Sequence, residues 1–334
     1  MTKRHRAAAR VRTLGVTAAL AAACAHPGRL AARPGGGTVA TAHEGFVRAA
    51  DGVALYYRAL GAGRDTAVVV HGGPGFGLES LAPDLAPLAR DRVLIFYDQR
   101  GAGRSTLLTD STRLTVDDHL SDLGAVVAHF RLAHPALIGH SWGAGLVVRY
   151  AAAHPAAVGP LVLLEPVVPR LVPYFAQFNE ALIARAGPDD LRAFGEVSAP
   201  ARLAADPLGS CRARTAILMR LWGGADSVRG RAKADLCGMS AEAYRAAQAH
   251  TVPGANASLR GADLRADAAA VATPVLLVWG QSDPTPAAAI GEWKATLRHV
   301  TVLPVAAGGH FAHAERADVV LPAVDAFLRH AGLP

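Results

Sequence analysis

The sequence predicts an α/β fold in which a mostly parallel central sheet is flanked by helices and a helical cap is inserted late in the chain. Short runs that are apolar throughout alternate with helical patterns, as expected for strands covered by helices on both faces. The runs are 67–70, 93–97, 136–138, 161–164, 274–279 and 300–304. Several of them end in glycine-rich turns, and the alternation stops between 165 and 271, where prolines punctuate irregular helical patterns.

The elements near the start of the predicted domain have local signals. An Asp-Gly pair at 51–52 lies between the runs 45–49 and 54–59 and predicts a hairpin turn. Further along, Thr115 precedes an amphipathic pattern over 116–132. Its hydroxyl can accept a hydrogen bond from a free amide of a first helical turn, so we expect a helix over this range.

The most informative motif is Gly-His-Ser-Trp-Gly at 139–143, which closes one apolar run and opens a helical pattern. A serine between two glycines at a strand-to-helix turn projects its hydroxyl above the sheet, and side chains at the glycine positions would collide with their neighbours. The motif predicts that Ser141 is a nucleophile. We expect His140 to be a packing or pocket residue, because the position beside the serine cannot easily reach its hydroxyl.

A glycine-rich turn, His-Gly-Gly-Pro-Gly at 71–75, directly follows the run 67–70. Such a turn leaves backbone N–H groups free to face a ligand. A serine nucleophile needs donors for the oxyanion that develops during attack on a carbonyl. We expect these donors to be the amides of Gly73 and of Trp142, the residue after the nucleophile.

The acid and the base of a triad are expected in loops after two late strands. Asp283 follows the run 274–279, and the prolines beside it favour a loop. His310 follows the run 300–304 and is preceded by two glycines. Along the chain the serine comes first, then the acid and then the histidine. This is the order expected when the nucleophile lies at a strand-to-helix turn. The predicted catalytic triad is therefore Ser141, Asp283 and His310.

Alternative assignments for the acid and for a metal were considered. Glu165 ends the run 161–164 and is an alternative acid. His310, His313 and Glu315 resemble a metal cluster, but the glycine pair before His310 favours a loop over the helix face that such a cluster needs. We expect no metal and no cofactor, and we expect His119 to be solvated on a helix face.

A second loop at the sheet edge, 98–105, follows the run 93–97. We expect Asp98 and Arg100 to pair and brace it. Its Gly-Ala-Gly sequence does not predict nucleotide binding, because no third glycine follows at the required spacing.

The blocks 71–75, 98–105 and 139–143 together resemble the α/β-hydrolase superfamily and, within it, the proline iminopeptidase-like (prolyl aminopeptidase) group. The segments around Asp283 and His310 are similar to the family's acid and base blocks. The resemblance implies a serine hydrolase that forms an acyl-enzyme and releases an N-terminal, proline-like residue from short peptides or amides. The alternative is an esterase or lactonase acting on small apolar acyl substrates, because the first two blocks also occur in such relatives.

The sequence departs from this group in the cap. The family holds the substrate's free ammonium with cap carboxylates, one of them in a Trp-Glu-Gly sequence, whereas here Trp222 is followed by glycine. The cap carboxylates that could substitute are Glu180, Glu196 and Asp226. The candidate walls of a substrate pocket are Tyr174, Phe175 and Phe178.

The N-terminal sequence predicts export. Five basic residues and no acidic ones lie in 1–24, and they precede the uncharged run 14–23, which is too short to span a membrane. The run ends at Cys24 in a sequence that resembles a bacterial lipobox. We expect lipidation at Cys24 and a location in the bacterial cell envelope, with ordinary cleavage to a periplasmic or secreted form as the alternative, and a cytoplasmic enzyme as a further one.

The remaining chain is expected to have three parts after the signal peptide at 1–24. These are a flexible tether at 25–44, a core at 45–165 and 271–334, and a cap at 166–270. The net charge of +7 is concentrated before the core, so no nucleic-acid partner is expected. The expected substrate is a small molecule or a short peptide. An exported protein could pair the two cap cysteines, Cys211 and Cys237, as a disulfide.

Overall fold

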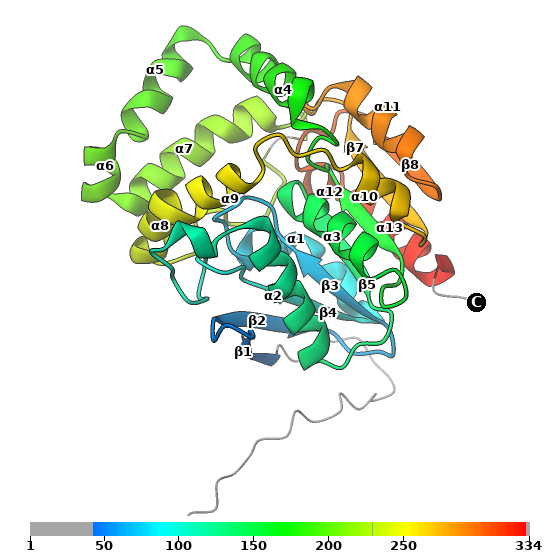
Figure 1. Cartoon of the computed structure of the whole chain (residues 1–334). Coiled ribbons are helices and arrows are strands. Elements are labelled where there is room, and N and C mark those ends of the chain that lie inside the picture. The colour runs from blue at the N-terminus through cyan, green and yellow to red at the C-terminus, as the bar shows by residue number, and fades with distance from the viewer. Residues whose placement is uncertain (1–42, 229, 332–334) are drawn as a thin grey trace, which may run out of the picture. The chain divides into compact units, whose positions relative to one another are not determined.

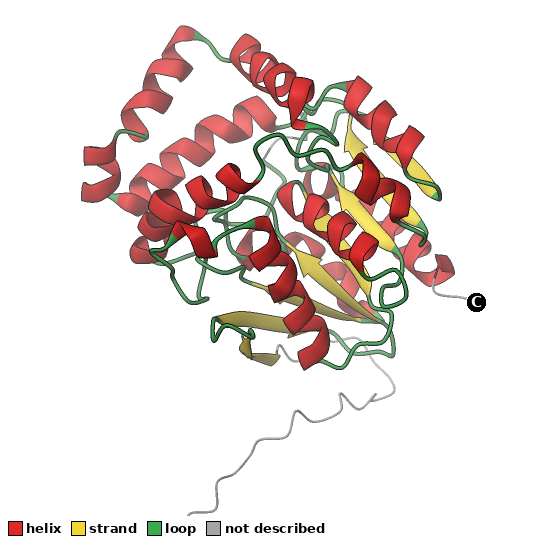
Figure 2. Cartoon of the chain, viewed as in Figure 1, coloured by secondary structure: helices red, strands yellow, loops and turns green. Residues whose placement is uncertain are grey.

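The computed structural model describes residues 43–228 and 230–331. Eight strands form one sheet in the order β1-β2-β4-β3-β5-β6-β7-β8 (Figures 1 and 2). The strands from β4 across to β8 pair in parallel, whereas β1 and β2 pair antiparallel at one edge. Their bounds are β1 His43–Arg48, β2 Ala54–Leu60, β3 Thr66–Val70, β4 Val93–Tyr97, β5 Ala136–His140, β6 Leu161–Leu164, β7 Val275–Gly280 and β8 Val300–Val305. The predicted α/β class is confirmed.

Helices cover both faces of this sheet (Figure 1). On one face pack α2 (Val116–His129), α3 (Trp142–Ala153), α10 (Arg265–Ala270) and α11 (Ala287–Thr296). On the other pack α1 (Ala82–Leu85), the short 3₁₀ helices η1 (Leu78–Ser80) and η2 (Ala86–Arg90), α12 (Ala312–Glu315) and α13 (Ala317–Ala331). Because both faces are covered, every residue of β4 and β6 is buried, which explains why these strands are apolar throughout.

Local signals account for the ends of several elements. Gly52 has a φ of 87° in the turn between β1 and β2, a conformation that favours glycine. Thr115 caps α2 and forms a reciprocal capping box with Asp118. The predicted helix was three residues too long at its C-terminus, because the chain leaves the helix at Phe130 and Arg131 takes a φ of 51°.

The segment between β6 and β7 is largely helical, and no strand occurs in its described part. It contains α4 (Leu171–Arg185), α5 (Pro188–Val197), α6 (Pro200–Ala205), α7 (Pro207–Trp222), α8 (Ala241–Ala246), the π-helical turn η4 (Ala247–Thr251) and α9 (Val252–Ser258). Two elements at the end of this segment reach the main core: α9 buries Ala255 there, and α10 contacts α3 and buries Ala268.

A disulfide joins two parts of the cap, and hydrogen bonds join the cap to the core. Cys211 and Cys237 form a disulfide between α7 and the segment that follows it. The carboxylate of Asp84 on α1 accepts hydrogen bonds from the amides of Lys233 at 2.8 Å and Ala234 at 3.1 Å. These bonds tie an irregular cap segment to the core.

The predicted signal peptide, the lipidation site Cys24 and the tether as far as residue 42 lie outside the described residues. Strand β1 begins at His43, two residues before the predicted start of the core at 45. Within the part of the chain that the structure describes, no helix has both the length and the apolar character needed to cross a membrane.

Candidate active site

Ser141 lies at the turn between β5 and α3. Its φ is 51° and its ψ is −115°, a strained conformation for a residue with a side chain, costing on the order of 1–3 kcal/mol. The turn requires glycine beside it: a Cβ on Gly143 would lie 2.2 Å from the carbonyl oxygen of Val70. The close approach of α3 to β3 therefore explains the glycine two residues after the serine, and the turn presents the hydroxyl at the carboxyl end of the sheet.

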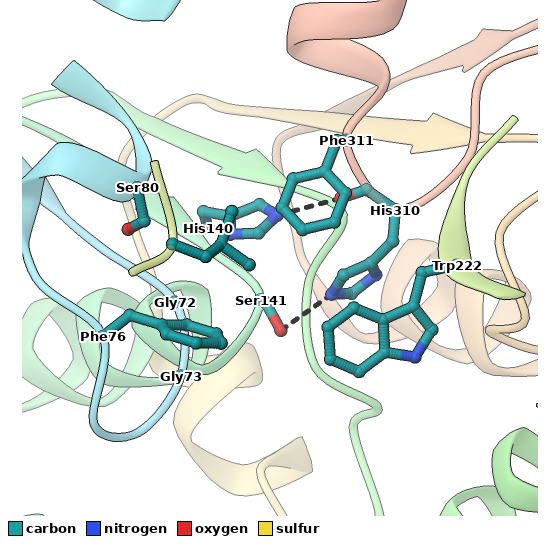
Figure 3. A pocket seen from close by; sticks show the side chains of 10 residues that line it. Gly72, Gly73, Phe76, Ser80, His140, Ser141, Trp222, His310 and Phe311 are labelled. Atoms are coloured by element: carbon teal, nitrogen blue, oxygen red, sulfur yellow. Dashed lines mark hydrogen bonds between the residues drawn. The ribbon is translucent and has the colours of Figure 1, made fainter. Parts of the chain in front are cut away.

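The structure brings Ser141, His310 and Asp283 together. Figure 3 shows the contact between His310 and Ser141. The Nε2 atom of His310 lies 3.0 Å from the Oγ atom of Ser141, and its Nδ1 atom lies 2.8 Å from Oδ2 of Asp283. The other oxygen of Asp283 accepts a hydrogen bond from the amide of Thr285 at 2.7 Å. Burial works to lower the pKa of His310, but the charge and hydrogen bond of Asp283, together with the charges of Glu165 and Glu315, raise that pKa above its ordinary value.

The main chain of His310 is held on both sides. Its N–H donates to the carbonyl of Trp222 in the cap at 2.8 Å, and its carbonyl accepts from Nε2 of His140 at 2.9 Å (Figure 3). Glu315 supports the same loop, because its carboxylate accepts the amides of Gly309 at 2.6 Å and Gly224 at 2.8 Å. This support was missed from the sequence, where Glu315 was considered only as a metal ligand.

The two expected oxyanion donors lie on neighbouring segments. Gly73 lines the same cavity as Ser141 and has a φ of 129°, and Trp142 is the first residue of α3. A side chain that sequence reasoning missed joins these segments. Gln99 donates to the carbonyl of His71 at 2.8 Å and accepts the indole N–H of Trp142 at 2.9 Å. Gln99 therefore fixes the turn that carries Gly73 relative to the helix that begins at Trp142.

The predicted pairing of Asp98 with Arg100 is wrong. Arg100 makes a bidentate pair with Asp122 on α2, with both N–O distances at 2.7 Å, and Asp98 instead accepts the amides of Leu78 and Arg104. Asp122 presents both of its carboxylate oxygens to the planar guanidinium of Arg100, whereas the oxygens of Asp98 face backbone amides.

The prediction for His119 is also wrong. Its side chain is buried on α2, and its ring packs edge-on against that of Trp142 at a centroid distance of 5.6 Å. The helical pattern alone did not show that this face of α2 meets the nucleophile turn.

A small cavity of about 30 Å³ adjoins Ser141 (Figure 3). None of its ten described lining residues is Asp or Glu: Gly72, Gly73, Phe76, Ser80, His140, Ser141, Trp222, Leu236, His310 and Phe311. Apolar side chains therefore dominate the wall away from the triad. The volume corresponds to about two water molecules.

The cap residues singled out from the sequence lie at different distances from this cavity. The ring of Phe178 lies 6.2 Å from that of His310, and Phe175 stacks on Phe178 at 6.4 Å. Tyr174 instead packs in a separate cluster with Val168 and Ala289. The three candidate carboxylates of the cap are exposed and none of them lines the cavity: Glu180, Glu196 and Asp226.

The alternative acid and the alternative metal cluster are arranged differently from the sequence hypothesis. Glu165 contacts Nδ1 of His313 at 3.1 Å, whereas Nδ1 of His310 contacts Asp283. Among the described residues, one group has ligand atoms close enough to hold a cation: His140, Glu165 and His313, whose atoms lie within 4.8 Å of one another. Hydrogen bonds already engage these three side chains. Neither His310 nor Glu315 belongs to the group.

Residues 67–317 match the sequence model of the α/β hydrolase fold, which spans more than half of the chain. With its parallel sheet and its nucleophile turn, the chain belongs to the α/β hydrolase family. Comparison with curated protein sequences gave no match.

Solved structures with this fold include proteins described with different activities. A proline iminopeptidase from Mycobacterium smegmatis is 19% identical with a TM-score of 0.65, covering 86% of this chain and 98% of its own. Est816, described as an N-acyl homoserine lactone degrading enzyme, is 19% identical with a TM-score of 0.58, covering 86% of this chain and 99% of its own. A thermophilic esterase from Thermogutta terrifontis is 18% identical with a TM-score of 0.60, covering 87% of this chain and 100% of its own. At these identities the likeness shows the fold alone.

Proposed function

We propose that the chain is a serine hydrolase that works through an acyl-enzyme. In this proposal Ser141 is the nucleophile, His310 the general base and acid, and Asp283 the residue that orients His310. The contacts of 3.0 Å and 2.8 Å within this set support the assignment, since a nucleophile, a base and an orienting acid must lie within hydrogen-bond reach.

The reaction follows from these positions. His310 accepts the Ser141 proton at Nε2 as Oγ attacks the substrate carbonyl, and the amides of Gly73 and Trp142 donate to the resulting oxyanion. Collapse of this intermediate breaks the bond to the leaving group, which takes the proton from His310. A water then gives a proton to His310 and attacks the acyl-enzyme, and collapse releases the acid and returns the proton to Ser141.

For the substrate, we propose a carboxylic ester with a small apolar acyl group. The observation that carries this proposal is the wall of the cavity, which has aromatic and aliphatic side chains and no carboxylate among its described residues. An apolar wall favours acyl carbon atoms over a charged ammonium, because an ammonium without a counter-ion loses its hydration and gains no partner.

Release of an N-terminal, proline-like residue is the second candidate. The likeness of the blocks 71–75, 98–105 and 139–143 to the proline iminopeptidase-like group favours it. That activity requires an anion near the substrate's ammonium, and the cap carboxylates Glu180, Glu196 and Asp226 are exposed and outside the cavity wall.

The two candidates are distinguished with three substrates and the full chain: a butyryl nitrophenyl ester, a prolyl arylamide and the N-acetylated prolyl arylamide. The ester proposal predicts a kcat/KM for the butyryl ester at least about 10²-fold above that for either arylamide, with no preference for the free amine. Strong cleavage of the prolyl arylamide that is lost on acetylation would contradict it and support the aminopeptidase.

We also propose that the protein is exported and lipid-anchored through Cys24 in a bacterial envelope. The leader sequence supports this, and the Cys211–Cys237 disulfide is compatible with an oxidising compartment. Metabolic labelling with a fatty-acid analogue in a bacterial host should label the wild-type chain and not Cys24→Ser. Equal labelling of the two would contradict the anchor.

A further inference from the structure

Three buried side chains lie beside the triad and take no part in the proposed chemistry. His140 ends β5, Glu165 follows β6, and His313 lies on α12, three residues after His310. Their exposures are 4%, 1% and 0%. Burying an acid and two imidazoles is costly unless they are paired, so their contacts need an explanation.

The three side chains form a connected path to the main chain of His310. The Oε2 atom of Glu165 lies 3.1 Å from Nδ1 of His313. It lies 3.9 Å from Nε2 of His140, too far for a hydrogen bond, and the His313 ring packs edge-on against the His140 ring at a centroid distance of 5.0 Å. The same Nε2 atom of His140 donates to the carbonyl of His310 at 2.9 Å. The path therefore joins the ends of β5 and β6 to α12 and to the loop that carries the base.

The pKa shifts of these three side chains favour the neutral form of each of them. Burial lowers the pKa of His140 well below its ordinary value and that of His313 to about 4, so both imidazoles are neutral near pH 7. Burial raises the pKa of Glu165 well above its ordinary value, which favours the uncharged acid. With His140 neutral, its single proton lies on Nε2, the nitrogen that faces the His310 carbonyl.

Maintaining this arrangement carries a cost to the fold. Glu165 adopts a φ of 42°, which is uncommon for a residue with a side chain. Within the described residues, its Oε1 atom and Nε2 of His313 are buried without hydrogen-bond partners. Strain and unsatisfied polar atoms persist where the surrounding structure requires a specific orientation, and they cluster at functional sites.

The orientation that depends on this path is that of His310. Its N–H is held by the carbonyl of Trp222 and its C=O by His140, which leaves the ring to meet Ser141 at 3.0 Å. Loss of the His140 contact would free the carbonyl and let the imidazole move relative to Ser141. A misplacement of about 1 Å at a reacting group costs about 10²-fold in rate.

We propose that Glu165 and His313 are positioning residues for hydrolysis: together they orient His140, which holds the main chain of His310 so that its Nε2 faces Ser141. The inference rests on the proposed function, because it assigns these residues to the same triad. Neither side chain contacts the substrate in this account.

The test pairs a disruptive and a conservative variant at each position. Glu165→Leu and His313→Leu remove the contact, and both should lower kcat by about 10–10²-fold with KM within twofold of wild type. Glu165→Gln retains an oxygen acceptor and His313→Asn retains an N–H near Nδ1, so both should recover most of kcat. Because the residues act through one path, the double leucine variant should be no slower than the worse single variant.

A control separates positioning from general loss of packing. The hydroxyl of Tyr97 is also buried without a partner, so Tyr97→Phe changes a buried polar group of the sheet without touching this path. It should leave kcat within twofold. The proposal is overturned if the leucine variants keep wild-type kcat, if they change only KM, or if Glu165→Gln is as slow as Glu165→Leu.

A second readout keeps this test distinct from the proposed substrate. The rate at which a fluorophosphonate labels Ser141 depends on activation of the serine by His310 and requires no substrate. The leucine variants should label about 10-fold or more slowly and the conservative variants near the wild-type rate. If the wild type is labelled but cleaves no ester, the proposed substrate fails while the labelling rates still decide the positioning proposal. Equal labelling rates in all variants would overturn it.

Discussion

The catalytic core and the helical cap are built in different ways. In the core, β4 and β6 are buried at every residue, and the triad residues lie in turns that follow β5, β7 and β8. In the cap, α5 and α6 have no fully buried residue, and a disulfide joins α7 to the segment after it. A rigid core can hold reacting atoms in place, whereas exposed cap helices such as α5 and α6 can be varied without loss of the fold.

The cap nevertheless reaches the site at a few points. Of the cavity's lining residues, Trp222 and Leu236 come from the cap, and the carbonyl of Trp222 also holds the main chain of His310. Under the proposed function, the comparison assigns the chemistry to the core and the shape of the substrate space to the cap. Changes in the core should therefore alter rate, and changes in the cap should alter stability or preference.

The largest effect is expected for the triad acid. Asp283→Asn should lower kcat/KM by about 10³–10⁴-fold, because His310 loses its orienting carboxylate. It should also shift the acid limb of the pH profile: in the wild type the raised pKa of His310 makes activity fall as pH decreases through a value above 6.5. Without Asp283, burial dominates and the limb moves to lower pH.

The matched control for this prediction is Glu242→Gln, an exposed carboxylate of the cap. It should leave both the rate and the pH profile unchanged. A kcat/KM for Asp283→Asn within tenfold of wild type would show that Asp283 is not the acid of the triad. Glu165 would then be the next candidate for that role.

The second prediction concerns the stability of the cap. Replacing both cysteines of the disulfide by serine opens a loop with a sequence separation of 26 residues. The free energy of unfolding should fall by about 3 kcal/mol on the chain-entropy estimate, while kcat of the folded protein stays within twofold. Chemical denaturation and initial rates measure the two quantities. A large loss of kcat in the folded double variant would show that the cap contributes to the chemistry itself.

The third prediction tests the core contact between the two oxyanion segments. Gln99→Leu removes the bonds to His71 and Trp142 and should lower kcat about 10²-fold, since the loss of an oxyanion donor costs 10²–10³-fold. Trp142→Phe removes only one of the bonds and should cost less, about 10-fold. Equal kcat for wild type and Gln99→Leu would show that the segments hold their positions without this side chain.

The smallest expected effect is on preference. Trp222→Ala enlarges the cavity and keeps the backbone carbonyl that holds His310. The ratio of kcat/KM for an octanoyl ester to that for an acetyl ester should rise about 10-fold, because added apolar volume accommodates more methylene groups. If the ratio for Trp222→Ala equals that of the wild type, the acyl group does not bind beside Trp222.

The parts of the site that could be predicted from the sequence depend on local backbone geometry. The φ of 51° at Ser141 and the 2.2 Å approach at Gly143 demand the residue pattern seen at 139–143. The loops that bear Asp283 and His310 follow strands with clear apolar runs. Parallel strands place their carboxyl ends at one edge, so these loops were expected to meet.

The parts that were missed depend on side chains that meet across the fold. Arg100 pairs with Asp122 and not with its near neighbour Asp98, and Gln99 forms hydrogen bonds with both His71 and Trp142. Neither set of contacts leaves a periodic pattern in the sequence.

The most direct test of the account is covalent labelling of the full chain with a fluorophosphonate, followed by peptide mass mapping. The account predicts one label per molecule, on Ser141, with no label on Ser141→Ala and normal folding of that variant. It also predicts that Ser80→Ala, which changes another serine of the same cavity wall, is labelled on Ser141 as the wild type is. A folded wild-type chain that stays unlabelled, or is labelled at another residue, would contradict the central claim that this core is an active serine hydrolase.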